Sequence, residues 1–444
     1  MKKNILTMLA LLVNVVLTAV AQETPAITFE AGAVERTITI GLNAAGTVKV
    51  DWGNGTLDEK EATAAYDGWD NALDFTGTPS GIVKIYGEGI NYFQAFTKYA
   101  EDATEITAGI SSINFNDATG ITELDIHQNN LTTVDLSKLT ALTKLNIGAN
   151  DFETIDLSAN TELTNIDISN SKNTGKLTSI DLSKNIKLTS VVLSGNKLKT
   201  LDFTNNPLIK TFTVLNNELT SVTFGENTVK NHTIQFGENK LTGIDLSGFK
   251  TFSGTYLRLR DNNISKAANI VLPGKIGQIW ADGNALPLNE LYELKSKAKT
   301  VTYASTYTKV QAQQPYAIAE SINVGESVDL SSQAKLGETA TVFTWKNAEG
   351  TALVEGTDYT TNNGVFTFLT AQEAIHAEMT NAELDAFTAE KPYTTTTLKV
   401  ATTTGITSMK ATYGQSVYYN LNGQRIAAPA KGMFIQNGKK VIKK

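Results

Sequence analysis

The sequence contains no cysteine and little of the other chemistry on which catalytic and metal sites depend. Its 444 residues include only three imidazoles, those of His127, His232 and His376. Without thiols there can be no disulfide, thiolate metal site, cysteine nucleophile or lipid-modified cysteine. The signatures of zinc proteases, serine hydrolases and phosphate-binding loops are missing as well. We therefore expect no enzyme, no cofactor and no metal site, with a glycosidase-type carboxylate pair as the remaining catalytic alternative.

Excess positive charge is also lacking. Thirty-eight basic residues face 45 acidic ones, which gives a formal net charge of −7. A protein that binds nucleic acid normally presents a basic face, so we expect no nucleic-acid partner. The 19% of charged and 41% of hydrophobic residues are typical of a globular chain. A chain of this length is expected to hold about two to four domains.

Long apolar runs are confined to the start of the chain. Residues 1–21 combine Lys2 and Lys3 with an apolar run and the small residues Ala19 and Ala21, as in a secretory signal peptide cut after Ala21. An uncleaved membrane anchor is the alternative. No later stretch is long enough to cross a bilayer. We expect an exported protein, either extracellular or at the cell surface and outer membrane, with no transmembrane segment after cleavage.

What the sequence does contain is one phrase repeated at a nearly constant interval. Each copy has an aliphatic residue, two spacers, an aliphatic–spacer–aliphatic triplet and then an asparagine, as in LTSVVLSGN. Copies begin at Ile121, Leu142, Leu163, Leu188, Ile209, Asn231, Gly254 and Ile276, which are 21 to 25 residues apart. A second phrase, LTSIDLS or a variant of it, runs between them. In the third copy Ser171 interrupts the asparagine column, and a short insertion follows.

This pattern resembles the leucine-rich repeat, and in particular the short repeats of secreted and surface proteins of Bacteroidota. The resemblance implies a solenoid in which each triplet forms a short parallel strand. One coil buries about six aliphatic side chains worth ~1.5–3 kcal/mol each. Ordering its ~21 backbone units costs ~1–2 kcal/mol apiece, so a coil is stable only when it is stacked on others. The predicted fold class is mostly β, a leucine-rich repeat solenoid flanked by two β-sandwich modules.

The recurring polar residues of the phrase are expected to be structural. The asparagines are predicted to turn inward and to bond the turn backbone of adjacent coils. They are Asn129, Asn150, Asn196, Asn217, Asn239, Asn262 and Asn284. The aspartates of the second phrase, Asp156, Asp181 and Asp245, also recur once per coil, which marks them as part of the repeat rather than as catalytic carboxylates.

Residues on either side of each buried triplet position point outward and form a strand face. In the early coils this face is small, polar and acidic, with Asp125, Asn146 and Asp167 in its middle column. The last two coils instead gather residue types that are enriched in binding hot spots. These candidate ligand-binding residues are Tyr256, Arg258, Arg260, Trp280 and Asp282. Arg258 should neighbour Trp280, and Arg260 should neighbour Asp282. The alternative is that these residues seal a junction with the following domain.

The segments around the repeats predict further modules. Residues 22–80 alternate at period two, and their VDWGNG phrase resembles PKD-like modules; Asp51 and Asn54 there predict a turn rather than a calcium site. Residues 81–303 form the solenoid with its caps, including a helix whose Leu288, Leu291 and Leu294 share one face. Residues 304–404 resemble an immunoglobulin-like sandwich with Trp345 in its core. Within it, residues 370–384 fit either a strand or a short helix.

The last segment, residues 405–444, is basic and contains Asn422-Gly423 and Asn437-Gly438, which predict hairpin turns. It resembles the C-terminal sorting tail of type IX secretion substrates. An ordinary terminal β-hairpin module is the alternative.

Two functions remain open from the sequence. The first is a surface or secreted adhesion protein that binds a protein or a polysaccharide on the strand face. The second is a structural spacer of the cell envelope without a specific ligand. A glycan-degrading enzyme is a distant third. The sequence predicts neither the ligand nor the oligomeric state.

Overall fold

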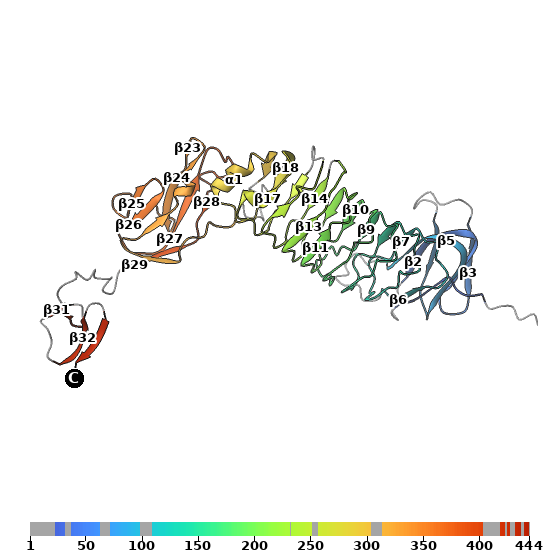
Figure 1. Cartoon of the computed structure of the whole chain (residues 1–444). Coiled ribbons are helices and arrows are strands. Elements are labelled where there is room, and N and C mark those ends of the chain that lie inside the picture. The colour runs from blue at the N-terminus through green and yellow to red at the C-terminus, as the bar shows by residue number, and fades with distance from the viewer. Residues whose placement is uncertain are drawn as a thin grey trace, which may run out of the picture. The chain divides into compact units, whose positions relative to one another are not determined.

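The computed structural model describes residues 23–31, 37–62, 72–97, 109–230, 232–250, 256–302, 313–402, 418–421, 424–426, 431–436 and 439–443. The chain divides into two units, residues 1–197 and residues 198–444. Strands dominate both (Figure 1). The predicted signal peptide, residues 1–21, and both predicted Asn-Gly turns lie outside the described residues.

The first unit begins with antiparallel strands. They are β1 (Ile27–Ala31), β2 (Ile38–Asp51), β3 (Leu57–Glu61), β4 (Leu73–Gly77), β5 (Val83–Thr97) and β6 (Ile110–Phe115). Strand β2 pairs with β3, β4 and β5, and its isoleucine, leucine and valine side chains are buried. At its end, Oδ1 of Asp51 accepts hydrogen bonds from Gly53 N and Gly55 N, both at 2.9 Å. The predicted turn is therefore confirmed, while the PKD-like sandwich stays a prediction.

Strand β5 joins this antiparallel part to the repeats. Besides its antiparallel partner β2, it pairs in parallel with β7 (Glu123–Asp125), the first repeat strand, through Phe93 and Leu124. Asn129 of the first repeat also bonds both flanking segments: it donates to Ala95 O and accepts from Ile110 N. The segments around residues 83–97 and 110–115 therefore bond directly to the first coil.

Each repeat contributes one short strand, and consecutive strands pair in parallel. In the first unit the order is β7, β8 (Lys144–Asn146), β9 (Asn165–Asp167) and β10 (Ser190–Val192). In the second unit it is β12 (Thr211–Thr213), β14 (Thr233–Gln235), β16 (Tyr256–Arg258), β18 (Ile276–Trp280) and β19 (Ala298–Thr302). The second phrase forms two smaller parallel pairs, β11 (Thr200–Phe203) with β13 (Ser221–Phe224) and β15 (Ile244–Asp245) with β17 (Ile270–Val271).

The aliphatic positions of the repeat form the core, as the spacing predicts. The central residue of each triplet strand is nearly inaccessible, for example Leu145, Ile234 and Leu257. Its neighbours along the strand face the other way, because successive residues of a strand alternate between faces. The fold is thus mostly β with a solenoid at its centre, in agreement with the predicted fold class.

The predicted asparagine ladder is present in both units. The carboxamide oxygen of each ladder asparagine accepts a hydrogen bond from a backbone N–H about one coil earlier. In Asn262 this donor is Leu241 N at 2.9 Å, and Nδ2 donates to Phe236 O, Leu259 O and Arg260 O. The same acceptor bond is made by Asn129, Asn150, Asn196, Asn217, Asn239 and Asn284. Each rung therefore satisfies backbone groups that would otherwise be buried without partners.

The second phrase carries a further set of structural polar residues. Oδ1 of Asp156 accepts a hydrogen bond from Ser158 N at 2.9 Å, and Asp181 and Asp245 do the same for the serines two positions on. The recurring aspartates thus cap turns. Asn160 and Asn185, both fully buried, donate to backbone carbonyls of the preceding coil. The sequence analysis missed this second row, whose signal is an asparagine four residues after the turn aspartate.

The solenoid ends with the predicted helix and then continues for one more rung. Helix α1 (Leu288–Leu294) buries Leu288, Leu291 and Leu294. Strand β19 follows and pairs in parallel with β18. Gln313 then takes the place of a ladder asparagine, because Oε1 accepts from Leu286 N and Nε2 donates to Ala281 O. The chain therefore contributes to the ladder beyond residue 303.

Two sheets follow the solenoid. One contains β20 (Ser321–Asn323), β29 (Leu398–Ala401), β27 (Gln372–Thr380), β24 (Val342–Asn347) and β28 (Tyr393–Thr394), and the other β21 (Ser327–Asp329), β26 (Val365–Phe368) and β25 (Tyr359–Asn362). Trp345 of β24 is fully buried and lies 4.9 Å from Phe368 of β26, ring centroid to centroid. The strand alternative for residues 370–384 is correct, since β27 occupies most of them. The immunoglobulin-like classification stays a prediction.

Short elements complete the second unit. They are the 3-10 helices η2 (Ala267–Asn269) and η3 (Ser331–Gln333), the pair β22 (Lys335–Leu336) and β23 (Thr339–Ala340), and the tail strands β30 (Tyr418–Tyr419), β31 (Arg425–Ile426), β32 (Gly432–Gln436) and β33 (Lys439–Lys443). The tail strands form an antiparallel sheet in the order β31-β30-β32-β33. Strand β30 pairs antiparallel with β31, and β32 pairs antiparallel with β33.

Candidate binding surface

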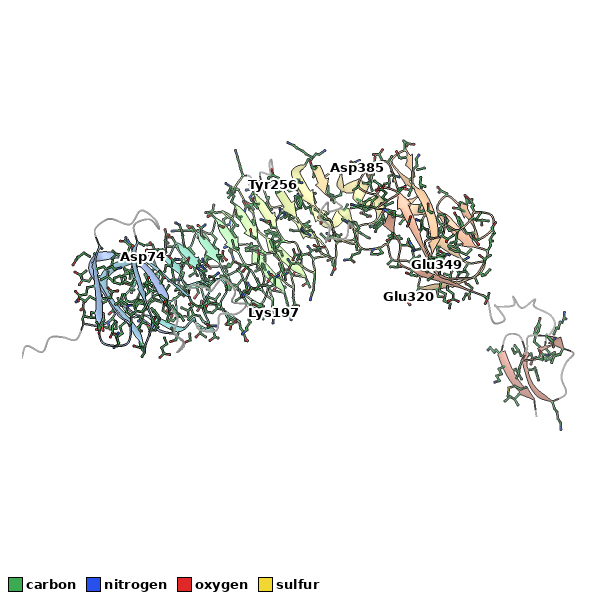
Figure 2. The ribbon with its side chains drawn as sticks, turned by 180° about the vertical axis from the view of Figure 1, so that it is seen from behind. Asp74, Lys197, Tyr256, Glu320, Glu349 and Asp385 are labelled. Carbon is green, nitrogen blue, oxygen red and sulfur yellow. The ribbon has the colours of Figure 1, made fainter. Side chains whose placement is uncertain are left out.

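The strand register brings the predicted binding residues together in two neighbouring coils. Strand β16 places Tyr256 beside Gln278 and Arg258 beside Trp280 of β18. Paired positions of adjacent strands lie ~4.8 Å apart, so their side chains are in direct contact range. Tyr256 is 58% exposed. Figure 2 labels it among the side chains of the solenoid.

Arg258 and Trp280 form a stacked pair at the centre of this region. The guanidinium carbon of Arg258 lies 4.5 Å from the centroid of the Trp280 ring. One guanidinium nitrogen, Nη1, donates to Gln235 Oε1 at 2.9 Å. Among the described residues, no carboxylate lies within ion-pair distance of Arg258. Because Arg258 and Trp280 are both half-exposed, the pair presents a cation and an aromatic ring to solvent.

Arg260 and Asp282 have a different role from the one predicted. Nε of Arg260 lies 3.1 Å from Asp261 Oδ2 and 3.9 Å from Asp282 Oδ2. Asp282 is only 1% exposed, and burial raises the pKa of its carboxyl although the charge of Arg260 opposes that shift. Asp282 therefore anchors Arg260 from below and is not available to a ligand. Arg260 is half-exposed like Arg258, but it is already paired with carboxylates. The exposed or half-exposed residues of the predicted site that have no such pair among the described residues are Tyr256, Arg258 and Trp280, which we call the late-coil patch.

The contacts between the solenoid cap and the following sheets lie on helix α1. Asn289 and Gln333 exchange two hydrogen bonds, and Nζ of Lys295 donates to Glu383 O at 2.8 Å. Within the described part of the chain, no residue of the late-coil patch has a hydrogen bond or ion pair to residues 320–402. Among the described residues, the hydrogen bonds and ion pairs between α1 and residues 320–402 thus do not involve the late-coil patch. The domain-seam alternative stays open.

A second feature of the strand face lies in the first unit. Strands β5, β7, β8, β9 and β10 line a hollow of about 300 Å³, which we call the early-coil hollow. Its lining side chains are mainly polar: Tyr92, Glu123, Asp125, Lys144, Asn146, Asn165, Asp167, Ser190 and Val192. The sequence analysis identified the acidic middle column but missed Glu123 and Lys144, which pair at 2.8 Å. Their signal was opposite charge at equivalent positions of successive repeats.

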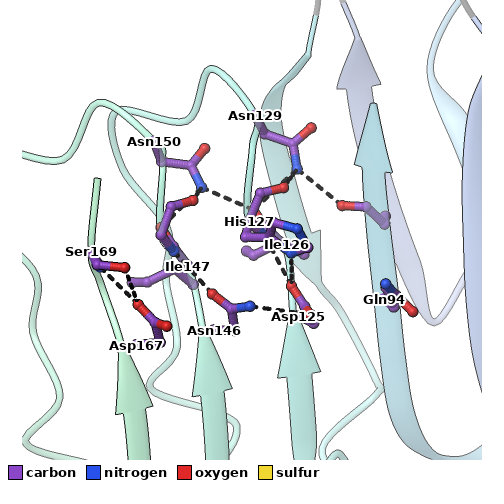
Figure 3. Close-up of polar contacts among 12 residues, drawn as sticks. Gln94, Asp125, Ile126, His127, Asn129, Asn146, Ile147, Asn150, Asp167 and Ser169 are labelled. Carbon is purple, nitrogen blue, oxygen red and sulfur yellow. Dashed lines mark hydrogen bonds and ion pairs between the residues drawn. The ribbon is translucent and has the colours of Figure 1, made fainter. Parts of the chain in front are cut away.

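Hydrogen bonds fix the polar column of the early-coil hollow (Figure 3). Nδ2 of Asn146 donates to Asp125 Oδ2 at 3.2 Å, and Asp125 Oδ1 accepts from the backbone and ring of His127. The hydrogen bond that the His127 ring makes to the Asp125 carboxylate raises the pKa of His127 above its usual value, against the effect of burial. One coil further on, Oδ1 of Asp167 accepts from Ser169 N and Oγ.

Neither region has the arrangement of a metal site or a membrane segment. In the part of the chain that the structure describes, no three histidine, aspartate or glutamate residues are grouped so as to hold a metal ion. The helices within that part are all too short or too polar to cross a bilayer.

The sequence matches no protein-family profile and no curated protein. Among solved structures, it is similar to the functional domain of InlJ from Listeria monocytogenes at 15% identity and a TM-score of 0.32, covering 65% of this chain and 68% of that one. It is also similar to the leucine-rich repeat domain of APL1B, at 16% identity and a TM-score of 0.34, covering 58% and 82%. A third is the LRIM1/APL1C complex, at 16% identity and a TM-score of 0.31, covering 58% of this chain and 52% of that chain.

The fold assignment itself comes from the chain's own geometry. Parallel strands recur once per repeat, their central aliphatic residues form the core, and the ladder asparagines bond from coil to coil. This combination is that of a leucine-rich repeat solenoid.

Proposed function

We propose that this chain is an exported binding protein that holds a protein partner on the strand face of its solenoid, with the late-coil patch as the anchor. Leucine-rich repeat solenoids present extended regular surfaces of this kind. Tyrosine, arginine and tryptophan are also the residue types that most often dominate binding energy.

The observation that carries this proposal is the stacking and exposure of the Arg258 guanidinium. Its guanidinium is stacked on Trp280 and half-exposed, and no carboxylate of the described residues lies within ion-pair distance of it, although the buried Asp282 acts on it electrostatically. In a protein with a net charge of −7, a half-exposed arginine that is held in one orientation is well suited to an anionic group of a partner. The stack contributes ~0.5–2 kcal/mol and orders the side chain before binding.

The partner chemistry follows from the same three side chains. Arg258 suits a carboxylate, while Tyr256 and Trp280 offer apolar ring surface beside it. An acidic segment of a protein satisfies both requirements. A uronate-bearing polysaccharide would satisfy them too, by stacking a sugar ring on Trp280. The test below therefore includes polyuronates.

The location is part of the proposal. The basic start of the chain and its apolar run support export, and the resemblance of residues 405–444 to a sorting tail supports display at the cell surface or outer membrane. Adhesion is the function that best joins such a location to a binding face.

A panel of extracellular-matrix proteins, mucins and polyuronates, immobilised on a biosensor and exposed to the full chain, tests this proposal. We expect saturable binding to at least one surface, weakened in Arg258→Ala and unchanged in Lys275→Ala. Lys275 is an exposed cation of the same coils, so its variant controls for net charge. Binding that Lys275→Ala weakens equally would contradict a specific anchor, and a flat response across the panel would favour the structural spacer.

A further inference from the structure

The early-coil hollow is a separate surface with the opposite electrostatic character. It lies on five successive strands of the first unit and has a volume of about 300 Å³. Its floor consists of the buried residues Leu124, Leu145 and Ile166, and its walls are hydrogen-bonding side chains. The hollow is therefore a depression in the strand face of the first unit, and none of its lining residues belongs to the late-coil patch.

The carboxylates of this hollow are held in place before any ligand arrives. Both oxygens of Asp125 accept hydrogen bonds, from His127 and from Asn146. Asp167 uses Oδ1 for Ser169 N at 2.9 Å and Ser169 Oγ at 2.6 Å. Its Oδ2 receives no hydrogen bond from the described residues, so it is available to a donor in the hollow. A fixed acceptor loses little conformational entropy when a ligand binds.

The charge around the hollow is strongly one-sided. Residues 23–197 contain 24 acidic and 12 basic residues, a formal net charge of −12. The hollow has one basic lining residue, Lys144, and that residue is already paired with Glu123. A cationic ligand would therefore be attracted over a distance and then meet an unoccupied acceptor at Asp167.

We infer that the early-coil hollow is a second binding site, which takes an arginine or lysine side chain presented by a segment of a protein partner. The cation would donate to Oδ2 of Asp167, with Asp125 as the second fixed charge two strands away. Asn165 and Ser190, on the rim, offer hydrogen-bonding groups to the main chain of such a segment. A volume of about 300 Å³ suits a single long side chain with part of its backbone.

This inference is independent of the proposed function of the late-coil patch. The two sites have opposite charge preferences and no residue in common. A cationic probe therefore tests the hollow, whereas anionic partners test Arg258, and either site can fail alone.

Fluorescence anisotropy of a labelled peptide of alternating glycine and arginine, titrated with the full chain at low ionic strength, tests the hollow. We expect saturable binding that Asp167→Asn weakens by at least about tenfold, the equivalent of about 1.4 kcal/mol. Asp181→Asn is the matched control, because it removes one carboxylate charge at an exposed turn of the same unit. It should leave the affinity within about twofold.

Asparagine at position 167 retains the oxygen that accepts from Ser169, so the variant should fold and its melting temperature verifies this. Arg258→Ala should leave binding of the arginine peptide unchanged. If Asp167→Asn and Asp181→Asn lost equal affinity for the peptide, net charge alone would explain the binding, and the inference would be overturned. Absence of binding by the wild-type chain would overturn it as well. The inference would also be overturned if the neutral glucan laminarin displaced the peptide and bound the chain more tightly than the peptide does.

Discussion

Replacing Asn262 by alanine should remove one complete rung of the asparagine ladder. The residue is 1% exposed, accepts from Leu241 N at 2.9 Å, and donates to Phe236 O at 2.9 Å and Leu259 O at 3.0 Å. Alanine leaves the Leu241 amide and these carbonyls buried without that partner. One unsatisfied buried group costs about 1–3 kcal/mol. Since the carbonyls of a solenoid keep other bonds, we expect a loss of about 3 kcal/mol in all.

Hydrogen exchange resolves this loss at the affected rung. In the full chain several parts can unfold separately, so a single global transition is not assured. The exchange rate of the adjacent Lys240 amide, which bonds Leu219 O and keeps this acceptor in the variant, reports the opening of its own coil. A loss of about 3 kcal/mol corresponds to an acceleration of more than a hundredfold at this amide.

The adjacent Asn263 provides the matched control, because its side chain is exposed and only its backbone N–H bonds the preceding coil, at Leu241 O. Asn263→Ala should change stability by no more than about 0.5 kcal/mol. If Asn262→Ala and Asn263→Ala accelerate exchange at the Lys240 amide equally, the ladder does not stabilise the solenoid and the reasoning is refuted.

Three further predictions concern other parts of the chain. A hydrogen bond from Ser158 lowers the pKa of Asp156, so the ionised carboxylate stabilises the fold above pH 3.8. This contribution disappears as the pH falls through the lowered pKa. Asp156→Asn should therefore melt at a lower temperature than wild type at neutral pH, and this difference should vanish in acid. Gly195→Ala should lower the free energy of unfolding by more than about 2 kcal/mol, because the φ of Gly195 is +73° and a Cβ there would lie 1.9 Å from Asn170 O. Gly46 has the same φ but open space around it, so Gly46→Ala should cost only about 1–2 kcal/mol. Thermal melts of both variants check this difference. Deletion of residues 405–444 should leave a folded protein that accumulates in a different cell fraction, and unchanged surface display would contradict the sorting role.

The repeat period made the strand register predictable. Parallel strands of equal period place equivalent residues side by side, so the contact of Arg258 with Trp280 and the neighbourhood of Arg260 and Asp282 follow from alignment alone. The ladder was predictable for the same reason, because a buried polar residue that recurs once per coil must bond the backbone of its neighbours.

The burial of individual side chains, and the roles of residues outside the repeat pattern, could not be predicted in this way. Alternation along a strand gives the side on which Asp282 lies, but its burial depends on how Arg260 folds over it. Gln313 escaped notice because it is a glutamine, 29 residues after Asn284, where the repeat pattern has already ended. The early-coil hollow arises from the relative sizes of side chains on five strands, which a one-dimensional pattern does not express.

The double variant Arg258→Ala with Trp280→Ala tests the central claim most directly. Its affinity for the surface identified on the panel and its melting temperature are measured on the same preparation. If the late-coil patch is the anchor, affinity should fall by about 2 kcal/mol or more, roughly thirtyfold, while the melting temperature barely moves. A melting temperature lowered by several degrees with unchanged affinity would show that these residues stabilise the fold instead, and would contradict the account.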